Sequence, residues 1–319
     1  MPYAPLRIAK KERALARGFF YAIISATCYG LGPIIFKLGM ASGMSELDML
    51  LSRFVIAAPI LAAFFLVTDK KKLAPRPRTL VRAAIAAFGF YALESYCFMR
   101  ALTYIPAATN SLIFYIYPLL VTLLSALFFG FRIRRLTVAA LLFILAGTSL
   151  VGHDAFVRQA PLAGVFFSLA ATFIFSCYLL LVQRFMRDED PLTLTFYVFV
   201  FMAISYAFLH NPSSLLRFSQ EQLLWGSLAA IFPTVLAVPL LYASIRKIGG
   251  AYASIFSSFE LVATLTAAKL VLNEPISAEQ VFGMAAIMLG VALPNLRLDY
   301  LRRRLNSPAG SPSDGDPAP

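Results

Sequence analysis

The sequence predicts an all-α membrane protein in which ten transmembrane helices form two inverted repeats of five helices. Three observations support this fold class. First, apolar segments of about 20 residues recur along the chain, which is the helical length that crosses the hydrocarbon core of a bilayer. Second, 60% of the residues are hydrophobic, only 14% are charged, and the mean hydropathy is +0.76, values outside the range of soluble domains. Third, the two halves of the chain resemble each other.

Each apolar segment must be helical, because lipid offers no hydrogen-bond partner to an open backbone. The first segment follows Lys10 and Lys11 as a signal peptide would, but it is too long for a signal core and no small-residue cleavage site follows it. We therefore interpret it as a retained first span. The predicted spans are 18–39, 48–67, 80–103, 106–129, 136–152, 161–184, 191–209, 222–245, 250–272 and 278–296.

Helix-breaking residues interrupt three of these spans. Proline removes a backbone donor and kinks a helix, which can form a hinge or expose carbonyl groups. Because proline is common in membrane helices, each break alone is weak evidence for a mechanism. The breakers are Gly30, Gly32 and Pro33 in the first span, Pro118 in the fourth, and Pro233 and Pro239 in the eighth.

The positive charge is confined to alternate loops. If the amino-terminal side is the inner side, 22 of the 28 Lys and Arg residues lie on it, and the outer loops hold only Arg158 and Arg217. This asymmetry follows the positive-inside rule and explains the net charge of +12 without a nucleic-acid partner. We expect a multi-pass protein of the cytoplasmic (inner) membrane with both termini in the cytoplasm.

These charges and spans divide the chain into four parts. We expect a basic cytoplasmic N-terminus at 1–17, a first repeat at 18–152, a second repeat at 161–296 and a disordered cytoplasmic tail at 306–319. The tail consists mainly of Pro, Ser, Gly and Asp and has too little apolar surface to fold. The three cysteines, Cys28, Cys97 and Cys177, lie within spans, so we expect free thiols.

The internal repeat is visible in aligned segments. Residues 104–118 (YIPAATNSLIFYIYP) align without gaps with residues 247–261 (KIGGAYASIFSSFEL) at an offset of 143, and Gly147 then meets Gly290. Gly18 meets Gly164 at an offset of 146. Five spans per half place the second copy upside down in the membrane, as in many secondary transporters whose substrate site lies near the midplane between the halves.

The same segments resemble a known family. The first repeat carries the motif ALTYIPAATNSL at 101–112, followed by Pro118 and Gly130, and the second span begins with Leu51-Ser52-Arg53-Phe54. The second repeat carries Ser254, Phe259-Glu260, Asn273-Glu274-Pro275 and Gly290. This pattern, over roughly 18–296, resembles the EamA family of the drug/metabolite transporter (DMT) superfamily. The aromatic content is similar to that of bacterial amino-acid exporters of the YddG kind.

The resemblance has two departures and several implications. Leu261 stands where the second repeat usually has Pro, which makes a kink there doubtful, and Phe131 stands where the first repeat usually has Glu. The resemblance implies that spans 5 and 10 are peripheral, that the other spans line a cavity, and that the solutes are amino acids or related compounds moved outward.

Glu260 is the sharpest candidate for a binding residue. It lies about ten residues into its span, and therefore about 15 Å deep, where an acid is costly unless it is paired, solvated or protonated. It shares a small and polar helix face with Ala253, Ser257, Thr264 and Ala268. That face could line a wet cavity in which Glu260 holds a substrate ammonium or a coupling proton, or it could pack tightly against a neighbouring helix.

Further candidates lie on three other spans. The matching face of the fourth span carries Asn110, Phe114 and Tyr117, whose rings could equally be ordinary packing, and the third span carries Tyr91 and Glu94 one turn apart. Arg53 and Lys37, toward the outer ends of their spans, either snorkel to the interface or bind substrate carboxylates in an outer vestibule. The predicted substrate-binding set is therefore Tyr91, Glu94, Asn110, Phe114, Tyr117, Ser257 and Glu260, with Arg53 and Lys37 for a carboxylate.

The sequence contains no phosphate-binding loop, no metal-binding motif and no catalytic set at membrane depth. We therefore expect no enzymatic activity and no cofactor, and transport driven by solute or proton gradients. Our leading hypothesis is a secondary transporter that exports small polar metabolites, amino acids and in particular aromatic ones, by alternating access. The alternatives are a multidrug or quaternary-amine exporter and a non-transporting membrane scaffold; a channel lacks a filter sequence.

Overall fold

The computed structural model describes residues 4–102, 104–105, 110, 113–151, 161–272 and 276–306. Within these ranges the regular structure is entirely helical. Seven helical segments are long and apolar enough to cross a membrane, and three shorter apolar helices, Tyr117–Phe129, Arg135–Val151 and Ala278–Leu293, complete ten spans. The predicted all-α membrane fold is confirmed. The predicted tail at 306–319 lies outside the described residues except for Asn306, which ends the last helix.

The first repeat contains five spans. They are α1 (Ala4–Gly30) with α2 (Gly32–Ala41); α3 (Glu46–Thr68); α4 (Pro77–Ala84) with η2 (Ile85–Tyr91) and α5 (Ala92–Leu102); α7 (Tyr117–Phe129); and α8 (Arg135–Val151). A short 3-10 turn, η1 (Lys70–Leu73), links α3 to α4. The basic N-terminus continues the first helix, since α1 begins at Ala4.

The second repeat has the same order of spans. They are α10 (Leu162–Phe185); α11 (Pro191–Leu209); α12 (Gln220–Ala230) with η4 (Ile231–Leu236) and α13 (Ala237–Ile248); α14 (Gly250–Ser257) with α15 (Phe259–Leu272); and α16 (Ala278–Asn306). The 3-10 turn η3 (Pro212–Arg217) links α11 to α12.

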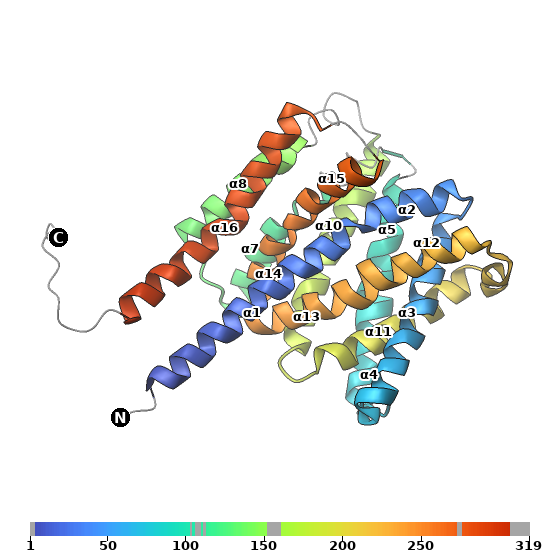
Figure 1. The fold of residues 1–319 in the computed structure, drawn as a ribbon, viewed down its shortest axis with the longest axis horizontal. Coiled ribbons are helices and arrows are strands. Elements are labelled where there is room, and N and C mark those ends of the chain that lie inside the picture. The colour runs from blue at the N-terminus through green and yellow to red at the C-terminus, as the bar shows by residue number, and fades with distance from the viewer. Residues whose placement is uncertain are drawn as a thin grey trace, which may run out of the picture.

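The fifth spans of the two repeats, α8 and α16, lie side by side at one edge of the molecule (Figure 1). A Cβ on Gly147 would meet the carbonyl oxygen of Gly283 at 2.6 Å, and a Cβ on Gly290 would meet the carbonyl oxygen of Ala140 at 2.7 Å. Positions along α16 therefore fall as those along α8 rise, so the two helices are antiparallel. Equivalent helices that run antiparallel are the mark of an inverted repeat.

A second pair of contacts obeys the same symmetry. A Cβ on Gly18 would lie 2.6 Å from the side chain of Ile248, and a Cβ on Gly164 would lie 2.5 Å from that of Ile105. Gly18 lies in α1 and Gly164 in α10, the first helix of each repeat, and both isoleucines belong to the opposite repeat. The two repeats thus pack against each other at glycines, which let the helices approach closely.

Equivalent spans are also interrupted at equivalent places. The fourth span has a turn at Tyr115, and α7 begins at Tyr117; the ninth span has a turn at Ser258, 143 residues after Tyr115. The ninth span therefore breaks even though Leu261 replaces the proline, so the sequence-based doubt about a kink there was wrong. Contacts of the 3-10 type, Ser258 N–H to Ile255 O at 3.3 Å and Leu261 N–H to Ser258 O at 3.3 Å, bridge the break.

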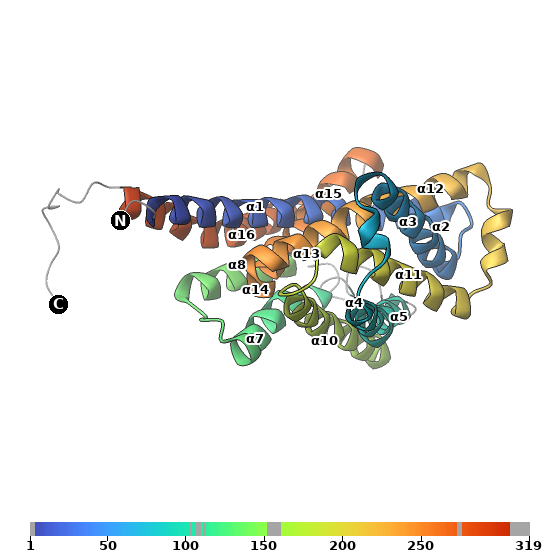
Figure 2. The same ribbon diagram turned by 90° about the horizontal axis from the view of Figure 1, so that it is seen from below.

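The third and eighth spans each contain a π-helical segment. These segments, η2 and η4, begin at Ile85 and Ile231, which are 146 residues apart, the same offset that relates Gly18 to Gly164. A π-helical turn carries one extra residue and frequently occurs at functional sites. Figure 2 shows the bundle from a perpendicular direction, with α1 and α16 along one side and α7 and α10 along the opposite side.

Candidate functional site

Arg53 of α3 lies at the meeting point of the two π-helical segments. Its side chain is only 8% exposed. Its Nε donates to the Thr234 hydroxyl at 2.5 Å, and its Nη2 donates to the Tyr91 hydroxyl at 3.1 Å and to the Pro233 carbonyl at 2.8 Å. The guanidinium also faces the ring of Phe54, 5.1 Å from its centroid. The structure thus places Arg53 inside the bundle, joining the second, third and eighth spans.

The Arg53 guanidinium retains unused binding capacity. A guanidinium has five N–H donors, and the three contacts above use those of Nε and Nη2. Among the described residues, no carboxylate forms an ion pair with Arg53 and no acceptor is recorded for Nη1. A buried charge without a counterion is costly, so this cation favours a negative partner.

Glu260 lies in the first turn of α15, directly after the break in the ninth span. The residue is half-buried, and its carboxyl group lies close enough to interact with the hydroxyl of Tyr115, a residue at the equivalent break in the fourth span. Arg53, Tyr117 and Tyr29 are close enough to interact electrostatically with this carboxyl group. The carboxyl group therefore faces a cluster of polar side chains in the interior of the bundle.

The backbone of Glu260 is packed more tightly than its side chain. A Cβ on Gly30 of α1 would lie 2.6 Å from the Glu260 carbonyl oxygen and 3.0 Å from the Thr264 nitrogen. The sequence left two roles open for the small face of the ninth span, tight packing against a helix and exposure to a polar interior, and the structure shows both. The backbone of this face packs against α1, while Glu260 reaches toward the tyrosines.

Aromatic rings form one wall beside Glu260. Phe114, one of the predicted residues, contacts Phe98, Phe175 and Tyr117 with centroid separations of 5.2, 5.2 and 5.5 Å. Tyr117 is 2% exposed and lies close enough to Ser257 to interact with its side chain. The wall combines apolar ring faces with hydroxyl groups, a composition that suits a ligand with a polar end and an apolar end.

Glu94 is the second buried acid near Arg53. It is 7% exposed, its carboxylate accepts from Ser95 at 3.1 Å, and Arg53 is close enough to interact with it electrostatically. The Tyr206 hydroxyl near this group is buried without a hydrogen-bond partner. Tyr91 connects the regions of the two acids, since its hydroxyl accepts from Arg53 and lies close enough to interact with Tyr29.

Two predicted residues are not part of this cluster. Asn110 is fully buried, and its side chain donates to the Phe98 carbonyl at 3.2 Å, while Ser168 donates to the Asn110 backbone carbonyl at 3.2 Å. Asn110 therefore joins the third and sixth spans instead of facing Glu260. Lys37 is exposed on α2, and it is its neighbour Phe36 that contacts Arg53, at 5.8 Å.

Several residues of the site escaped the sequence-based prediction. Tyr29, Tyr115, Phe175 and Thr234 belong to the cluster, and the hydroxyl groups of Tyr178 and Tyr242 contact each other beside it. Tyr115 directly follows Phe114, so helical spacing places it off the stripe of Asn110, Phe114 and Tyr117; in the structure it lies in the turn at 115–116. Pro233 could have indicated Thr234 from the sequence. A proline within a span leaves a backbone carbonyl without its N–H donor, and a nearby hydroxyl can donate a hydrogen bond to that carbonyl.

Charged contacts join the two repeats at the basic side of the bundle. Arg82 donates to Glu189 at 2.5 Å and to Asp188 at 2.9 Å, and Thr79 donates to Glu189 at 2.7 Å. Lys72 and Asp190 pair at 3.0 Å. All the cations come from the first repeat and all the acids from the second. We call these residues, with Arg78, the basic-side cluster.

The opposite side has a smaller set of contacts between the repeats. His210 at the end of α11 contacts Asp48 of α3 at 2.8 Å, and the Gln222 side chain donates to the Ser42 carbonyl at 3.1 Å. The N-cap residues Ser45 and Asp190 occupy corresponding positions at the starts of α3 and α11. Contacts therefore cross from one repeat to the other on both of these sides of the bundle.

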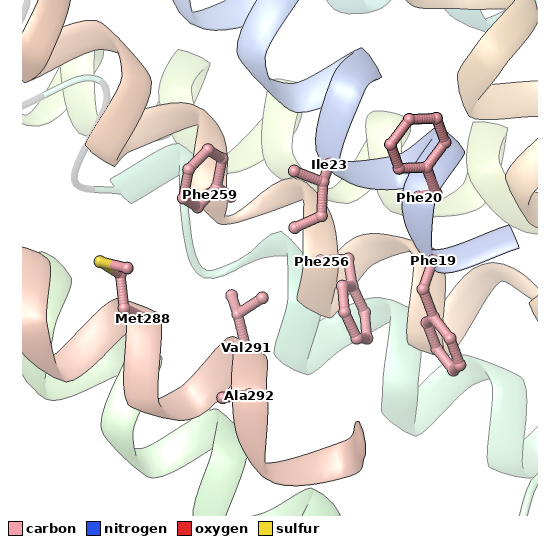
Figure 3. A pocket seen from close by; sticks show the side chains of 8 residues that line it. All are labelled: Phe19, Phe20, Ile23, Phe256, Phe259, Met288, Val291 and Ala292. Atoms are coloured by element: carbon pink, nitrogen blue, oxygen red, sulfur yellow. The ribbon is translucent and has the colours of Figure 1, made fainter. Parts of the chain in front are cut away.

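A separate apolar groove of about 360 Å³ opens between α1, the ninth span and α16 (Figure 3). It is lined by Phe19, Phe20, Ile23, Phe256, Phe259, Met288, Val291 and Ala292. Phe20 is 62% exposed, and the lining side chains carry no charge. This composition fits a surface in contact with lipid chains. In the described parts of the chain, no group of three or more His, Cys, Asp or Glu side chains is placed to hold a metal ion.

An inverted-repeat bundle with broken helices and charged side chains near mid-depth is the architecture of secondary transporters. The sequence profile of the EamA-like transporter family matches the chain twice, at residues 16–152 and 162–296. The chain belongs to this family, and it is an integral, multi-pass membrane protein. The family resemblance predicted from the sequence is confirmed.

Similar proteins agree with this assignment. An uncharacterized transporter, YyaM, of Bacillus subtilis is 27% identical over 255 residues, 75% of this chain and 81% of the relative. An uncharacterized transporter of Archaeoglobus fulgidus is 24% identical over 273 residues, 84% of this chain and 95% of the relative. A protein known from a crystal structure, 21% identical, covers 92% of this chain and 99% of its own with a TM-score of 0.71, which supports the fold.

Proposed function

We propose that the protein is a secondary transporter that exports small metabolites bearing both an ammonium and a carboxylate group, such as amino acids, across the cytoplasmic membrane. The observation that carries the proposal is the pair Arg53 and Glu260. These opposite charges lie in one buried tyrosine-rich cluster without forming an ion pair with each other in the described structure. A zwitterion could neutralise both.

The carboxylate of the substrate would bind at Arg53. The two free N–H groups of Nη1 are the donors available to it, while Nε and Nη2 stay bound to the protein. A charge-assisted hydrogen bond of this kind contributes about 1.5–3 kcal/mol, enough for a marked preference for carboxylate-bearing solutes. Lys37, exposed on α2, would contribute at most to an outer vestibule.

The ammonium group would bind at Glu260. Tyr115 and Tyr117 flank this carboxylate and offer hydroxyl and ring-face contacts to a cation. The aromatic wall of Phe114 and Phe175 would hold the apolar part of the solute, which favours aromatic amino acids. Ser257 and Tyr91 would border the site, and Glu94 would act as a second acid that tunes its charge or carries a coupling proton.

Alternating access would follow from the repeat symmetry. The basic-side cluster closes one end of the interior and the contact between His210 and Asp48 closes the other, so rocking of the repeats would open them in turn. The positive-inside charge distribution supports cytoplasmic termini and makes the basic side the cytoplasmic one. We expect residues 18–152 and 161–296 to move as the two units.

A second candidate function is the export of quaternary amines or other organic cations. The tyrosines around Glu260 favour it, because aromatic rings and an acid together bind such cations. The two functions differ in their need for Arg53. A cation without a carboxylate would not need Arg53, whereas an amino acid would.

Counterflow in proteoliposomes tests the proposed function. A panel of labelled amino acids, each paired with the amine that lacks its carboxyl group, is measured for wild type and Arg53→Gln, with and without a pH gradient. We expect saturable counterflow of at least one amino acid in wild type, and an Arg53→Gln variant that loses the amino acid but retains the amine. Counterflow of amines alone, equal in both proteins, would favour the organic-cation function, and no flux of any solute would favour a scaffold.

A further inference from the structure

We propose that Thr234 is a positioning residue that holds Arg53 in the orientation in which it receives a carboxylate. This inference rests on the proposed role of Arg53 and extends it to a residue outside the predicted set. Thr234 lies in η4 of the second repeat, whereas Arg53 lies in α3 of the first repeat. Thr234 is completely buried.

The orientation of the Arg53 guanidinium depends on Pro233, the residue before Thr234. In an α-helix the N–H of residue 233 would bond to the carbonyl of residue 229, but Pro233 has no N–H. The carbonyl of Ala229 therefore lacks its regular donor. The Thr234 hydroxyl supplies the missing proton, donating to the Ala229 carbonyl at 2.8 Å.

This donation fixes the direction of the hydroxyl group. A threonine hydroxyl has one proton and two lone pairs. Because the proton is directed at Ala229, the lone pairs are left for a donor on the other side, and Arg53 Nε occupies that position at 2.5 Å. The result is a continuous chain from Arg53 Nε through the Thr234 hydroxyl to the Ala229 carbonyl.

The same proline supplies a second anchor. The carbonyl of Pro233 accepts from Arg53 Nη2 at 2.8 Å. With Nε and Nη2 both fixed on η4 and on Tyr91, the guanidinium plane cannot rotate freely, and Nη1 remains the free edge. The geometry points to the helix break at Pro233 as a device that aims Arg53, in addition to any part it plays as a hinge.

Substitutions at 233 and 234 test the proposal in reconstituted full-length protein. Thr234→Val removes the hydroxyl and keeps the shape, and Thr234→Ser restores the hydroxyl. Pro233→Ala returns an N–H that can satisfy Ala229, which releases the Thr234 proton without weakening the helix. Thr195→Val is the matched control, because Thr195 is also fully buried and its hydroxyl donates to a proline carbonyl, that of Pro191, at 2.8 Å.

The readout is the KM and kcat of counterflow for L-phenylalanine and for phenethylamine, which lacks the carboxyl group. We expect Thr234→Val and Pro233→Ala to raise KM for phenylalanine roughly tenfold with little change in kcat, since loss of one charge-assisted contact weakens binding by that order. KM for phenethylamine should stay unchanged. Thr234→Ser and Thr195→Val should match wild type for both solutes, and thermal unfolding in nanodiscs identifies any variant that fails to fold.

The outcomes separate this inference from the proposed function. If Arg53→Gln selectively impairs phenylalanine but Thr234→Val and Pro233→Ala do not, the positioning role is overturned and the role of Arg53 survives. If Arg53→Gln itself has no selective effect, the proposed function fails and the inference fails with it. Equal changes for both solutes would mark Thr234 as structural only and would also overturn the proposal.

Discussion

Gly147 and Gly290 occupy the same position in a contact that the molecule makes twice. Gly147 of α8 rests on the backbone of α16 beside Ile287, and Gly290 of α16 rests on the backbone of α8 beside Ile144. Ile144 and Ile287 are themselves 143 residues apart, the offset that relates the two glycines. The fifth and tenth spans thus form an antiparallel pair related by an axis in the membrane plane.

Alanine at either glycine should destabilise the protein by a similar amount. The new Cβ would lie 2.6 Å from a carbonyl oxygen at position 147 and 2.7 Å at position 290, so α8 and α16 must separate. Overpacking of this kind costs about 1–3 kcal/mol. Thermal unfolding in nanodiscs measures the effect, with Gly89→Ala as the control, because a Cβ there meets nothing within 4 Å. Sensitivity at only one of the two glycines would contradict the symmetric contact.

Gly30→Ala should impair transport through the site itself. Its Cβ would lie 2.6 Å from the Glu260 carbonyl oxygen and would displace the first turn of α15. We expect the counterflow rate to fall by more than the loss of folded protein explains, and the KM for the solute to increase. The measurement compares initial counterflow rates, normalised to folded protein, with those of Gly89→Ala. Unaltered kinetics in a folded Gly30→Ala variant would show that the position of this turn is unimportant.

Arg82→Gln should open the basic side far more readily than Arg78→Gln. Both arginines contact Asp188, but the side chain of Arg82 is 9% exposed and also binds Glu189, whereas that of Arg78 is 66% exposed. Breaking a buried pair costs several kcal/mol, while an exposed pair contributes about 0–1 kcal/mol. Labelling of a cysteine introduced below the cluster, in a protein lacking its three native cysteines, reports the opening. Equal labelling of the two variants would refute a closing role for Arg82.

The basic-side cluster should be insensitive to pH across the physiological range. The hydrogen bond from Arg82, with the charges of Arg78 and Arg184, lowers the pKa of Asp188; burial opposes the shift at Asp190, but the bonds from Lys72 and Thr193 outweigh it and lower that pKa as well. Depressed folded-state pKa values mean that this stabilisation is complete above the ordinary Asp pKa of about 4 and is lost only as the pH falls through the lower values. Because the thiolate is the reactive form, labelling itself becomes faster as the pH rises, so each rate is divided by that of the same cysteine in unfolded protein at the same pH. This ratio should be constant from about pH 5 to 8. A rise in the ratio within that range would require another titrating group in the protein.

Much of the fold could be predicted from the sequence, because apolar length and charge asymmetry are local and physical. The ten spans follow from them, the inverted repeat follows from the similarity of the two halves, and the break at Gly30 to Pro33 follows from its glycine and proline residues. The break at Ser258 could not be predicted, since no proline or glycine marks it. It becomes visible only through its equivalence with the turn at Tyr115.

The site was predicted less completely, because its contacts join residues far apart in sequence. Glu260 could be selected by the cost of an acid at membrane depth, Tyr117 by its place on the matching face of the fourth span, and Arg53 by the affinity of a guanidinium for carboxylates. A regular helix through residues 110–121 would have placed Asn110 beside Glu260, but the turn at 115–116 brings Tyr115 there instead. No feature of Thr234 itself marks it in the sequence as part of the site. Its role depends on Pro233 beside it and on Arg53, which is 181 residues away.

Counterflow by a Glu260→Gln variant tests the central claim most directly. Gln keeps the size and the hydrogen-bonding capacity of Glu260 but cannot carry a negative charge, and Glu46→Gln, an exposed acid in the first turn of α3, is the matched control. We predict that Glu260→Gln folds normally and loses counterflow about 10- to 100-fold, as expected for removal of a charge-assisted contact worth about 1.5–3 kcal/mol, while Glu46→Gln transports like wild type. Wild-type counterflow in Glu260→Gln would contradict the account.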